Sequence, residues 1–202
     1  MTVYLRPDMA AAPQFNLHDH VGFLCGQIGN WRRVVFPFLA QGLARGERCV
    51  YLTSLHTPRL VESLLAELGV DLPAVKARRQ FLLLDASRYY LERGWFDPDR
   101  VILKNQAAVR LALGEGFAGL RAVSEMAWAA YQPRGWQDLR EYERRLNQEV
   151  FAGMPMSAIC LYDQLLFDPA QLEMVGETHP LLIDQQGRLR QGGFQGSAAV
   201  LA

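Results

Sequence analysis

Hydrophobic and polar positions form two different patterns along this chain. Short apolar runs, typical of buried strands, alternate with longer stretches in which apolar residues recur every three or four positions, as on one face of a helix. The strand-like runs lie at residues 20–26, 49–53, 81–85, 120–126 and 157–163. This alternation predicts a single α/β domain in three layers, with a mostly parallel central sheet of at least five strands and helices on both faces.

Residues that begin helices support this division. Thr57-Pro58, Asp97-Pro98 and Asp168-Pro169 each place a capping side chain before a proline, a combination that favours the first turn of a helix. Pro37 lies inside the first helical pattern, where it should kink the helix or mark its true start. The expected helices span residues 31–45, 58–68, 98–113, 138–150 and 169–174, and residues 181–183 and 188–189 are expected to form a terminal hairpin.

A glycine-containing turn, residues 27–30, follows the first predicted strand. The order strand, glycine turn, helix, Gly-Glu and second strand is the layout with which nucleotide-binding ATPases of the RecA/KaiC type begin. A working phosphate loop needs G-x-x-x-x-G-K-[ST], in which the lysine contacts the terminal phosphates and the hydroxyl binds Mg²⁺. Trp31, Arg32 and Arg33 occupy that stretch here. We therefore expect a degenerate loop and a protein that is not an enzyme.

Composition limits the partners and the location. The 202 residues contain 21 basic and 21 acidic side chains, so the charge gives no reason to expect direct nucleic-acid binding. No apolar run approaches the roughly 20 residues of a membrane-spanning helix, and the N-terminus lacks the apolar core of a signal peptide. Three cysteines in apolar runs are typical of reduced thiols, which predicts a cytoplasmic protein. The folded domain is expected at residues 17–190, between a flexible N-terminus (1–16) and a flexible tail (191–202).

Several short stretches, in this order, resemble the MEDS domain, the methanogen/methylotroph DcmR-type sensory domain. They are HVGF (20–23), PFLAQGL (37–43), GER (46–48), SEMAW (124–128), YERRLN (142–147), CLYD (160–163) and THP (178–180). The resemblance extends over residues 18–183 and implies a RecA/KaiC-like fold that has lost nucleotide hydrolysis. It also implies a sensor of small organic molecules in prokaryotic signal transduction.

The same resemblance bears on how a signal leaves the domain. Many members of the family carry the sensor beside a helix-turn-helix, a histidine kinase or another output module. No residues remain for such a module here. The output is therefore expected to pass through a protein partner, such as a regulator or kinase, or through a homo-oligomer.

Ligands of open parallel sheets bind beyond the carboxyl ends of the strands. We expect Glu125 and Tyr162 to orient the polar atoms of a small, weakly polar ligand at one shared site. Met126 and Trp128 would form its apolar wall. Two other interpretations stay open, in which Glu125 is satisfied by backbone or a helix N-terminus and Trp128 belongs to the core. The full set of ligand-binding candidates is Glu125, Met126, Trp128, Tyr162, Gln27, Asn30 and His20, drawn from the strand ends and the first strand.

Histidines raise the question of a metal. His18 and His20 are two residues apart, so they point to the same side if both lie on a strand, and Cys25 or His179 could complete a site. Zinc sites need three or four converging ligands, and the sequence has no Cys-x-x-Cys motif and no histidine pair at helical spacing. Structural histidines at the start of a strand are therefore the favoured interpretation. No cofactor can be assigned from the sequence.

Three functions remain in competition. The first is a non-enzymatic sensory module with a ligand site at the strand ends. The second is a residual nucleotide-binding protein, a weak ATPase that uses Arg32 or Arg33 in place of lysine. The third is an interaction protein whose own side chains fill a vestigial pocket. Trp31 would obstruct phosphates at the start of the helix, which disfavours the second.

Overall fold

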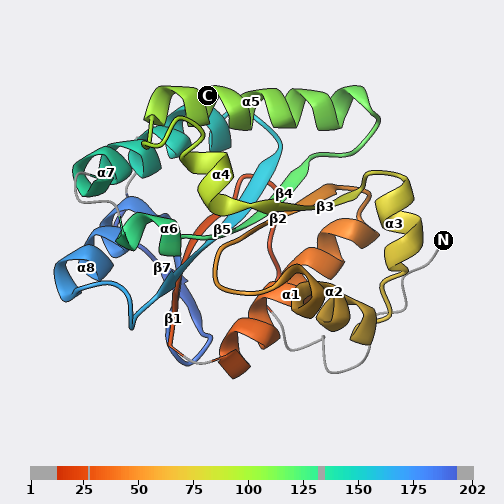
Figure 1. Ribbon diagram of the computed structural model, residues 1–202, viewed down its shortest axis with the longest axis horizontal. Coiled ribbons are helices and arrows are strands. Elements are labelled where there is room, and N and C mark those ends of the chain that lie inside the picture. The colour runs from red at the N-terminus through yellow and green to blue at the C-terminus, as the bar shows by residue number, and fades with distance from the viewer. Residues whose placement is uncertain (1–12, 27, 132–134, 195–202) are drawn as a thin grey trace, which may run out of the picture.

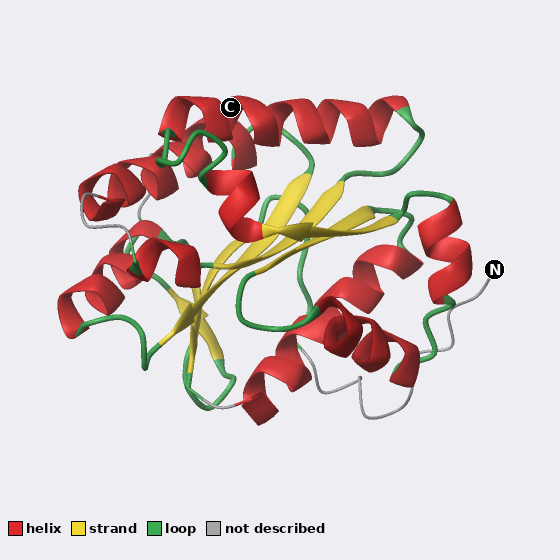
Figure 2. Cartoon of the chain, in the orientation of Figure 1, coloured by secondary structure: helices red, strands yellow, loops and turns green. Residues whose placement is uncertain are grey.

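The computed structural model describes residues 13–26, 28–131 and 135–194. Within them, a seven-stranded sheet with the order β3-β2-β4-β5-β1-β6-β7 lies between two layers of helices (Figures 1 and 2). Every strand pair is parallel except β6 with β7. The predicted fold class, an α/β domain with a mostly parallel sheet covered on both faces, is confirmed.

The strands agree closely with the apolar runs of the sequence. They are β1 (His20–Cys25), β2 (Arg48–Thr53), β3 (Phe81–Asp85), β4 (Leu120–Glu125), β5 (Met156–Asp163), β6 (Leu181–Ile183) and β7 (Leu189–Gln191). The antiparallel β6–β7 pair is the expected terminal hairpin. The central strands are buried on both faces, which is why they appear as continuous apolar runs and not as alternating patterns.

Three helices cover one face of the sheet and the remaining helices cover the other. The first group is α1 (Ile28–Ala44), α2 (Pro58–Glu67) and α3 (Leu72–Ala77), whose apolar side chains share a core with Val21, Phe23, Tyr51, Val123 and Ile159. The second is α4 (Ala86–Tyr90), α5 (Pro98–Gly114), α6 (Ala127–Ala130), α7 (Gly135–Leu146) and α8 (Pro169–Thr178). We call the two sides of the sheet the α1 face and the α5 face (Figure 1).

The predicted helix starts are confirmed by their hydrogen bonds. Thr57, Asp97 and Asp168 each accept a bond from the backbone N–H three residues later, and each precedes a proline in the first turn. Three short helices, α3, α4 and α6, were not predicted. Asp71 and Asp85 cap α3 and α4 in the same way, whereas α6 has no side-chain cap bond. Such short helices carry too few apolar positions to give a readable period.

Two local features of the helices bear on the candidate sites. Pro37 lies inside α1, so it neither begins nor ends that helix. The helix predicted at residues 138–150 is an α-helix only as far as Leu146, and it continues as a π-helical turn, η2 (Asn147–Phe151). Such turns are rare and are frequent at functional sites.

The ends of the domain extend further than the sequence indicated. Phe15 is fully buried and packs edge-on against Phe38, with ring centroids 5.1 Å apart. At the other end, the Gly193 N–H donates to the Gly176 carbonyl of α8 at 2.7 Å. Phe15 and Gly193, within the segments predicted to be flexible, thus make contacts with the domain. Residues 1–12 and 195–202 lie outside the described residues.

One ion pair is buried inside the α1 face. Arg121 donates to Glu47 through Nε at 2.5 Å and through Nη2 at 3.1 Å, and its Nη1 donates to the Phe38 carbonyl. Both ionic side chains are almost inaccessible to solvent. This pair links the start of β2 to β4 beneath α1. Among the described helices, none has both the length and the apolar character that crossing a membrane requires.

Candidate functional site

Glu125, the strongest sequence candidate, ends β4 and is surrounded by donors from its own chain. Its Oε1 accepts from the Tyr51 hydroxyl at 2.6 Å and from His56 Nδ1 at 2.7 Å. Its Oε2 accepts from the backbone N–H groups of Ser54, Leu55 and His56. Burial raises the pKa of this carboxyl, but these bonds outweigh it and hold the pKa below its usual value. Glu125 is thus a buried, ionised and fully paired carboxylate.

Trp31, at the start of α1, belongs to the same hydrogen-bonded group as Glu125. Its indole Nε1 donates to the Tyr51 hydroxyl at 3.0 Å, and its ring stacks on the His56 imidazole. The side chain is 1% exposed. We call Trp31, Tyr51, His56 and Glu125 the Trp31 network. Its side chains fill the volume beside the loop that follows β1, at the carboxyl ends of β2 and β4.

The expectation that Glu125 and Tyr162 share one site is wrong. In the register of β4 and β5, Glu125 lies opposite Leu161, so Tyr162 points to the other side of the sheet. Glu125 contacts Tyr51 on the α1 face, whereas Tyr162 packs in the core of the α5 face and donates to Glu143 Oε1 at 2.7 Å. The sheet itself therefore separates the two groups.

Met126 and Trp128 lie with Tyr162 in the core of the α5 face. Both are buried, and Trp128 stacks on Tyr90 with ring centroids 4.4 Å apart. Phe96 packs against the same indole. This aromatic packing corresponds to the core interpretation of Trp128 that the sequence left open.

Asn30 lies beside a hollow at the loop after β1. Its side-chain amide donates to the Gln185 carbonyl, and a cavity of about 400 Å³ there is lined by Gly26, Asn30, Gln185 and Gln186. These lining residues carry no charge. Gln27, the other candidate of this loop, lies outside the described residues.

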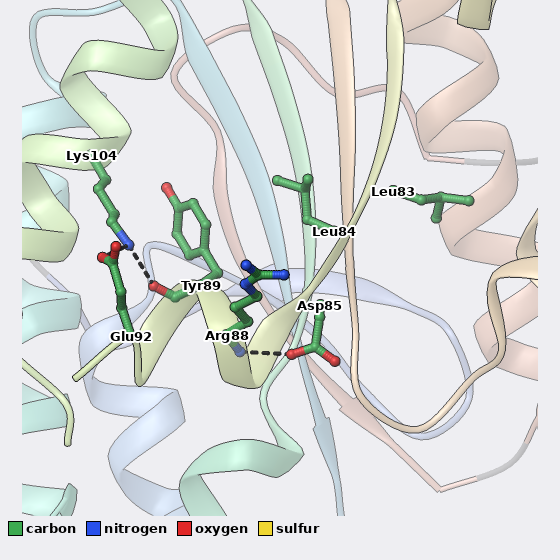
Figure 3. Close-up of a pocket in the computed structure, with 7 residues that line it drawn as sticks. All are labelled: Leu83, Leu84, Asp85, Arg88, Tyr89, Glu92 and Lys104. Atoms are coloured by element: carbon green, nitrogen blue, oxygen red, sulfur yellow. Dashed lines mark hydrogen bonds and ion pairs between the residues drawn. The ribbon is translucent and has the colours of Figure 1, made fainter. Parts of the chain in front are cut away.

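A second hollow, which we call the β3 pocket, lies at the carboxyl end of the edge strand β3. It measures about 470 Å³ and is lined by Leu83, Leu84, Asp85, Arg88, Tyr89, Glu92 and Lys104 (Figure 3). The sequence rule on strand ends indicates this region as well, since residues 85–90 directly follow a strand. Asp85 is already engaged as the cap of α4, where it accepts from the Arg88 N–H at 2.6 Å.

The two cations of the β3 pocket differ in how they are paired. Lys104 forms a 2.7 Å ion pair with Glu92 and also donates to the Tyr89 carbonyl. The Arg88 guanidinium has no carboxylate partner among the residues that the structure describes. The pocket therefore offers one unpaired positive charge beside the apolar side chain of Leu84.

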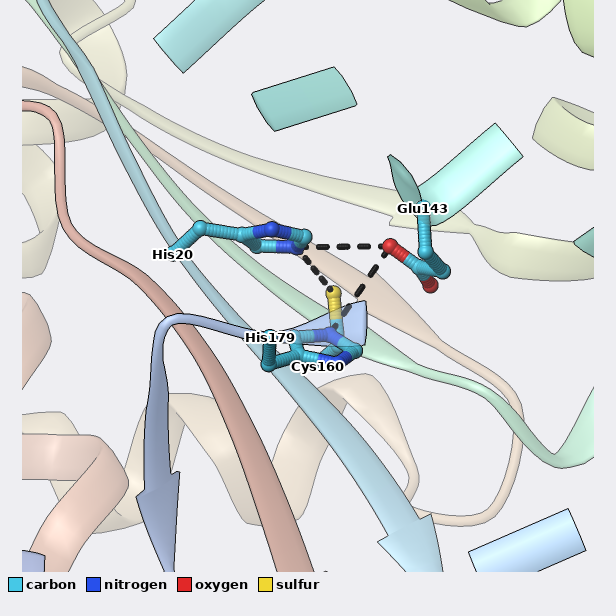
Figure 4. A group of neighbouring side chains, drawn as sticks. All are labelled: His20, Glu143, Cys160 and His179. Carbon is cyan, nitrogen blue, oxygen red and sulfur yellow. Dashed lines mark hydrogen bonds and ion pairs between the residues drawn. The ribbon is translucent and has the colours of Figure 1, made fainter. Parts of the chain in front are cut away.

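His20 belongs to a buried group of four metal-ligating side chains, which we call the His20 cluster. It comprises His20 of β1, Glu143 of α7, Cys160 of β5 and His179 after α8, with ligand atoms that all lie within 4.8 Å of one another (Figure 4). His20 Nε2 lies 3.3 Å from Glu143 Oε2 and 3.6 Å from Cys160 Sγ. His179 Nε2 lies 3.8 Å from the same Glu143 oxygen.

Burial and mutual contacts set the protonation of this cluster. The pKa of His179 is lowered to about 4, mainly by burial and then by the neighbouring His20, against the opposing effects of Glu143 and the hydrogen bond to Val175. Burial alone would raise the pKa of Glu143, but His179, His20 and the Tyr162 hydroxyl hold it below the usual value. Burial, followed by the charge of Glu143, raises the pKa of the Cys160 thiol. Glu143 is thus ionised and His179 neutral at pH 7.

The cluster differs from the histidine grouping considered for the sequence. His18 does not join His20, because its Nδ1 bonds the Phe151 carbonyl at 2.7 Å and its backbone has a positive φ of 80°. Cys25 lies on the α1 face of β1, opposite to His20. His179 is present as considered, but Cys160 and Glu143 take the remaining positions. Both occur in the stretches that carry the family resemblance, although no periodicity of the sequence pointed to them.

Comparison with known protein families gives one match. The profile described as MEDS, the methanogen/methylotroph DcmR sensory domain, matches residues 19–180. None of the curated proteins compared with the chain matches it. The family resemblance expected from the sequence is confirmed.

Solved structures share the fold. A KaiC-like protein from the hyperthermophilic archaeon Pyrococcus horikoshii OT3 superposes with a TM-score of 0.57 at 16% identity. The flagellar accessory protein FlaH from Methanocaldococcus jannaschii superposes with a TM-score of 0.56 at 12% identity. Each match covers 84% of this chain and 72% of the other. At these identities the similarity shows a common RecA/KaiC-like fold alone.

Proposed function

This chain belongs to the MEDS family of sensory domains, and from that membership we propose that it is a non-enzymatic module that binds a small organic ligand. The ligand site we propose is the β3 pocket, at the carboxyl end of a sheet strand. The observation that carries the proposal is the unpaired Arg88 guanidinium beside the apolar Leu84. The β3 pocket has a volume of about 470 Å³, which lies within the usual range for small-molecule sites.

The lining of the β3 pocket favours one chemical class of ligand. Lys104 is paired with Glu92, and the Asp85 carboxylate is engaged as the cap of α4, so Arg88 is the lining cation left for a ligand. Guanidinium groups bind carboxylates through two parallel hydrogen bonds. Leu84 would cover an apolar portion of the same molecule. We therefore propose a small organic anion with a short hydrocarbon part, such as a short-chain carboxylic acid.

Output through a partner chain or a homo-oligomer is part of this proposal. Helix α5 supplies Lys104 to the pocket and also exposes Leu103 and Leu111, at 60% and 53% of their surface. Exposed apolar side chains on one helix can form the centre of a protein contact. A ligand that displaces Lys104 from Glu92 would act on the same helix. The two buried thiols, Cys49 and Cys160, are consistent with a cytoplasmic location.

Nucleotide binding is the second candidate, because the fold is shared with a KaiC-like protein. Two features weigh against it. Trp31 is buried within its network where the phosphate loop would need room. The described residues that line the adjacent hollow are uncharged, so they supply no cation for a triphosphate. These features support the proposal that the loop is degenerate and that the protein does not hydrolyse nucleotides.

Thermal denaturation with a ligand panel tests the two candidates against each other. The panel contains short-chain carboxylic acids, the matching primary amides and MgATP, since a molecule that binds only the folded state raises its stability. We expect stabilisation by at least one acid and not by its amide. Stabilisation by MgATP alone would favour the nucleotide candidate. No response to the acids would contradict the proposed site.

A pair of arginine variants locates the site. Arg88→Gln should weaken binding of the responding acid by about 10- to 100-fold, as expected for the loss of a charged hydrogen bond worth about 1.5–3 kcal/mol. Arg110→Gln is the matched control, because Arg110 is an exposed arginine of α5 outside the pocket. Calorimetric titration gives both affinities. Equal affinities in the two variants would place the site elsewhere.

A further inference from the structure

The His20 cluster is drawn from four elements that are far apart in the sequence, and its ligand atoms converge on one point. The side chains come from β1, α7, β5 and the residue after α8, and each turns toward the same centre (Figure 4). Exposure is 5% for Cys160 and 0% for the other three. None of these groups takes part in the proposed ligand site in the β3 pocket.

The hydrogen bonds of His20 fix which of its nitrogens faces the centre. Asn147 donates through Nδ2 to the carbonyls of Glu143 and Thr178, so its Oδ1 is free to accept. His20 Nδ1 lies 2.8 Å from that oxygen and must therefore carry the proton. The lone pair of His20 Nε2 then points to Cys160 and Glu143. Asn147 occupies this position because it begins the π-helical turn.

His179 is oriented in the same way. Its Nδ1 lies 2.9 Å from the Val175 carbonyl, which can only accept, so Nδ1 donates and Nε2 again presents a lone pair. Gly22 makes this orientation possible, because a Cβ at that position would lie 3.0 Å from His179 Cγ. Hydrogen bonds from the outer nitrogens of two histidines to carbonyl oxygens are the usual support of metal-binding imidazoles.

Two atoms at the centre have no hydrogen-bond partner among the described residues. They are Glu143 Oε2 and His179 Nε2, both buried. His20 Nε2 adds a third lone pair, since Glu143 Oε2 lies 3.3 Å from it and 3.8 Å from His179 Nε2. Buried acceptors without a donor are costly, and a cation among them would satisfy all three. Glu143 Oε1 is held separately by the Tyr162 hydroxyl, which leaves Oε2 for the centre.

We propose that the His20 cluster binds one divalent transition metal, of which zinc is the best match, through His20 Nε2, Glu143 Oε2, Cys160 Sγ and His179 Nε2. Two imidazoles, a thiolate and a carboxylate are all common zinc ligands. Ligand atoms around a tetrahedral zinc are roughly 3.3–3.6 Å apart at the usual bond lengths. Three of the six pairs, at 3.3, 3.6 and 3.8 Å, are near that spacing, and all six lie within 4.8 Å.

Binding would displace the thiol proton of Cys160 to solvent and leave a thiolate on the metal. All four positions would then be filled by protein, which is the arrangement of a structural site and not of a catalytic one. Asn147 separates the cluster from a hollow at the surface. A hollow of about 370 Å³ is lined by His18, Asn147, Phe151, Ala152, Pro180 and Phe194, so Asn147 contacts both this hollow and His20.

Cobalt substitution tests this site directly. The full-length chain is stripped with a chelator, and Co²⁺ is added in steps under reducing conditions. We expect one ion per chain, with a thiolate-to-cobalt charge-transfer band in the near ultraviolet, and displacement of cobalt by zinc. Cys160→Ser should abolish that band and weaken metal binding by at least about 100-fold. Loss of a residue that only hydrogen-bonds to a metal ligand typically weakens metal binding by about 10- to 100-fold, and loss of a ligand itself should cost more.

Cys49→Ser is the matched control, because Cys49 is also a buried cysteine of a central strand but lies on the α1 face. It should keep the band and the affinity. Glu143→Gln provides a second test if Cys160→Ser does not fold, and it should also weaken binding. Persistence of the band in Cys160→Ser would overturn the proposal. So would a wild-type protein that takes up no stoichiometric cobalt or zinc and whose melting temperature neither metal changes.

Discussion

The indole of Trp31 lies flat on the imidazole of His56, with ring centroids 3.8 Å apart and planes inclined by 7°. Tyr51 accepts from the indole nitrogen and donates to Glu125, and Glu125 accepts from His56 in turn. These contacts close a ring of four side chains. The start of α1 is thereby fixed to the carboxyl ends of β2 and β4.

Glu125→Gln should destabilise the fold by about 2–3 kcal/mol, because a neutral amide cannot accept all five hydrogen bonds and leaves buried donors unpaired. Urea denaturation measures this change. Glu67→Gln is the control, since Glu67 pairs with Arg32 at a half-exposed surface position where the loss should stay below about 0.5 kcal/mol. Equal stabilities of the two variants would show that the Trp31 network contributes little.

The loss of folding stability at acid pH should depend in part on Glu125. Its pKa is lower in the folded chain than in the unfolded one, so its contribution is complete above the unfolded value of about 4.3 and is lost as the pH falls through the folded value. The difference in melting temperature between wild type and Glu125→Gln should therefore shrink below about pH 4. His179 titrates in both proteins and cancels from this difference. If the difference in melting temperature stayed constant from pH 7 to pH 3, the lowered pKa of Glu125 would be contradicted.

Gly22→Ala should destabilise the chain by about 1–3 kcal/mol through overpacking. A Cβ there would lie 2.7 Å from Val175 Cγ1 and 3.0 Å from both His179 Cγ and Leu182 Cδ2. Gly176→Ala is the matched control. A Cβ there would lie 3.7 Å from Leu182 Cδ1, an ordinary contact, and alanine is the better helix former inside α8, so that variant should be neutral or up to about 1 kcal/mol more stable. Thermal or chemical denaturation distinguishes the two.

Arg121→Met should cost about 3–5 kcal/mol, because Glu47 would keep a buried charge without its partner. The double variant Arg121→Met/Glu47→Leu should recover much of that loss, since removing both charges removes the penalty. Arg32→Met removes the cation of an exposed pair and should change stability by less than about 1 kcal/mol. A double variant as unstable as Arg121→Met alone would show that packing, and not the unpaired charge, causes the loss.

Much of the fold could be predicted from the sequence because its signals are local. Strands β2 and β5 are continuous apolar runs, and the start of α8 is marked by a capping aspartate followed by a proline. Such signals involve neighbouring residues only, and they hold in whichever tertiary structure the chain adopts. The short helix α4 was missed because one turn offers no measurable period.

The candidate site required the tertiary structure, because the face to which a strand residue points depends on its register. Glu125 and Tyr162 both end strands, but a register that pairs Glu125 with Leu161 places Tyr162 on the opposite face. A shift of one residue would have brought them together. The sequence shows that Glu125 and Tyr162 both end strands, but it does not show which residues of the two strands pair.

The sequence by itself determined the α/β class, most of the elements and the family, since these depend on composition and order along the chain. The tertiary structure decided which polar groups meet. His20, Glu143, Cys160 and His179 are separated by up to 159 positions, from 20 to 179, and no spacing rule connects them. They converge because β1 and β5 are adjacent in the sheet and α7 and α8 pack on the same face. Contacts between distant segments arise from packing as a whole, and packing is not encoded in any local pattern.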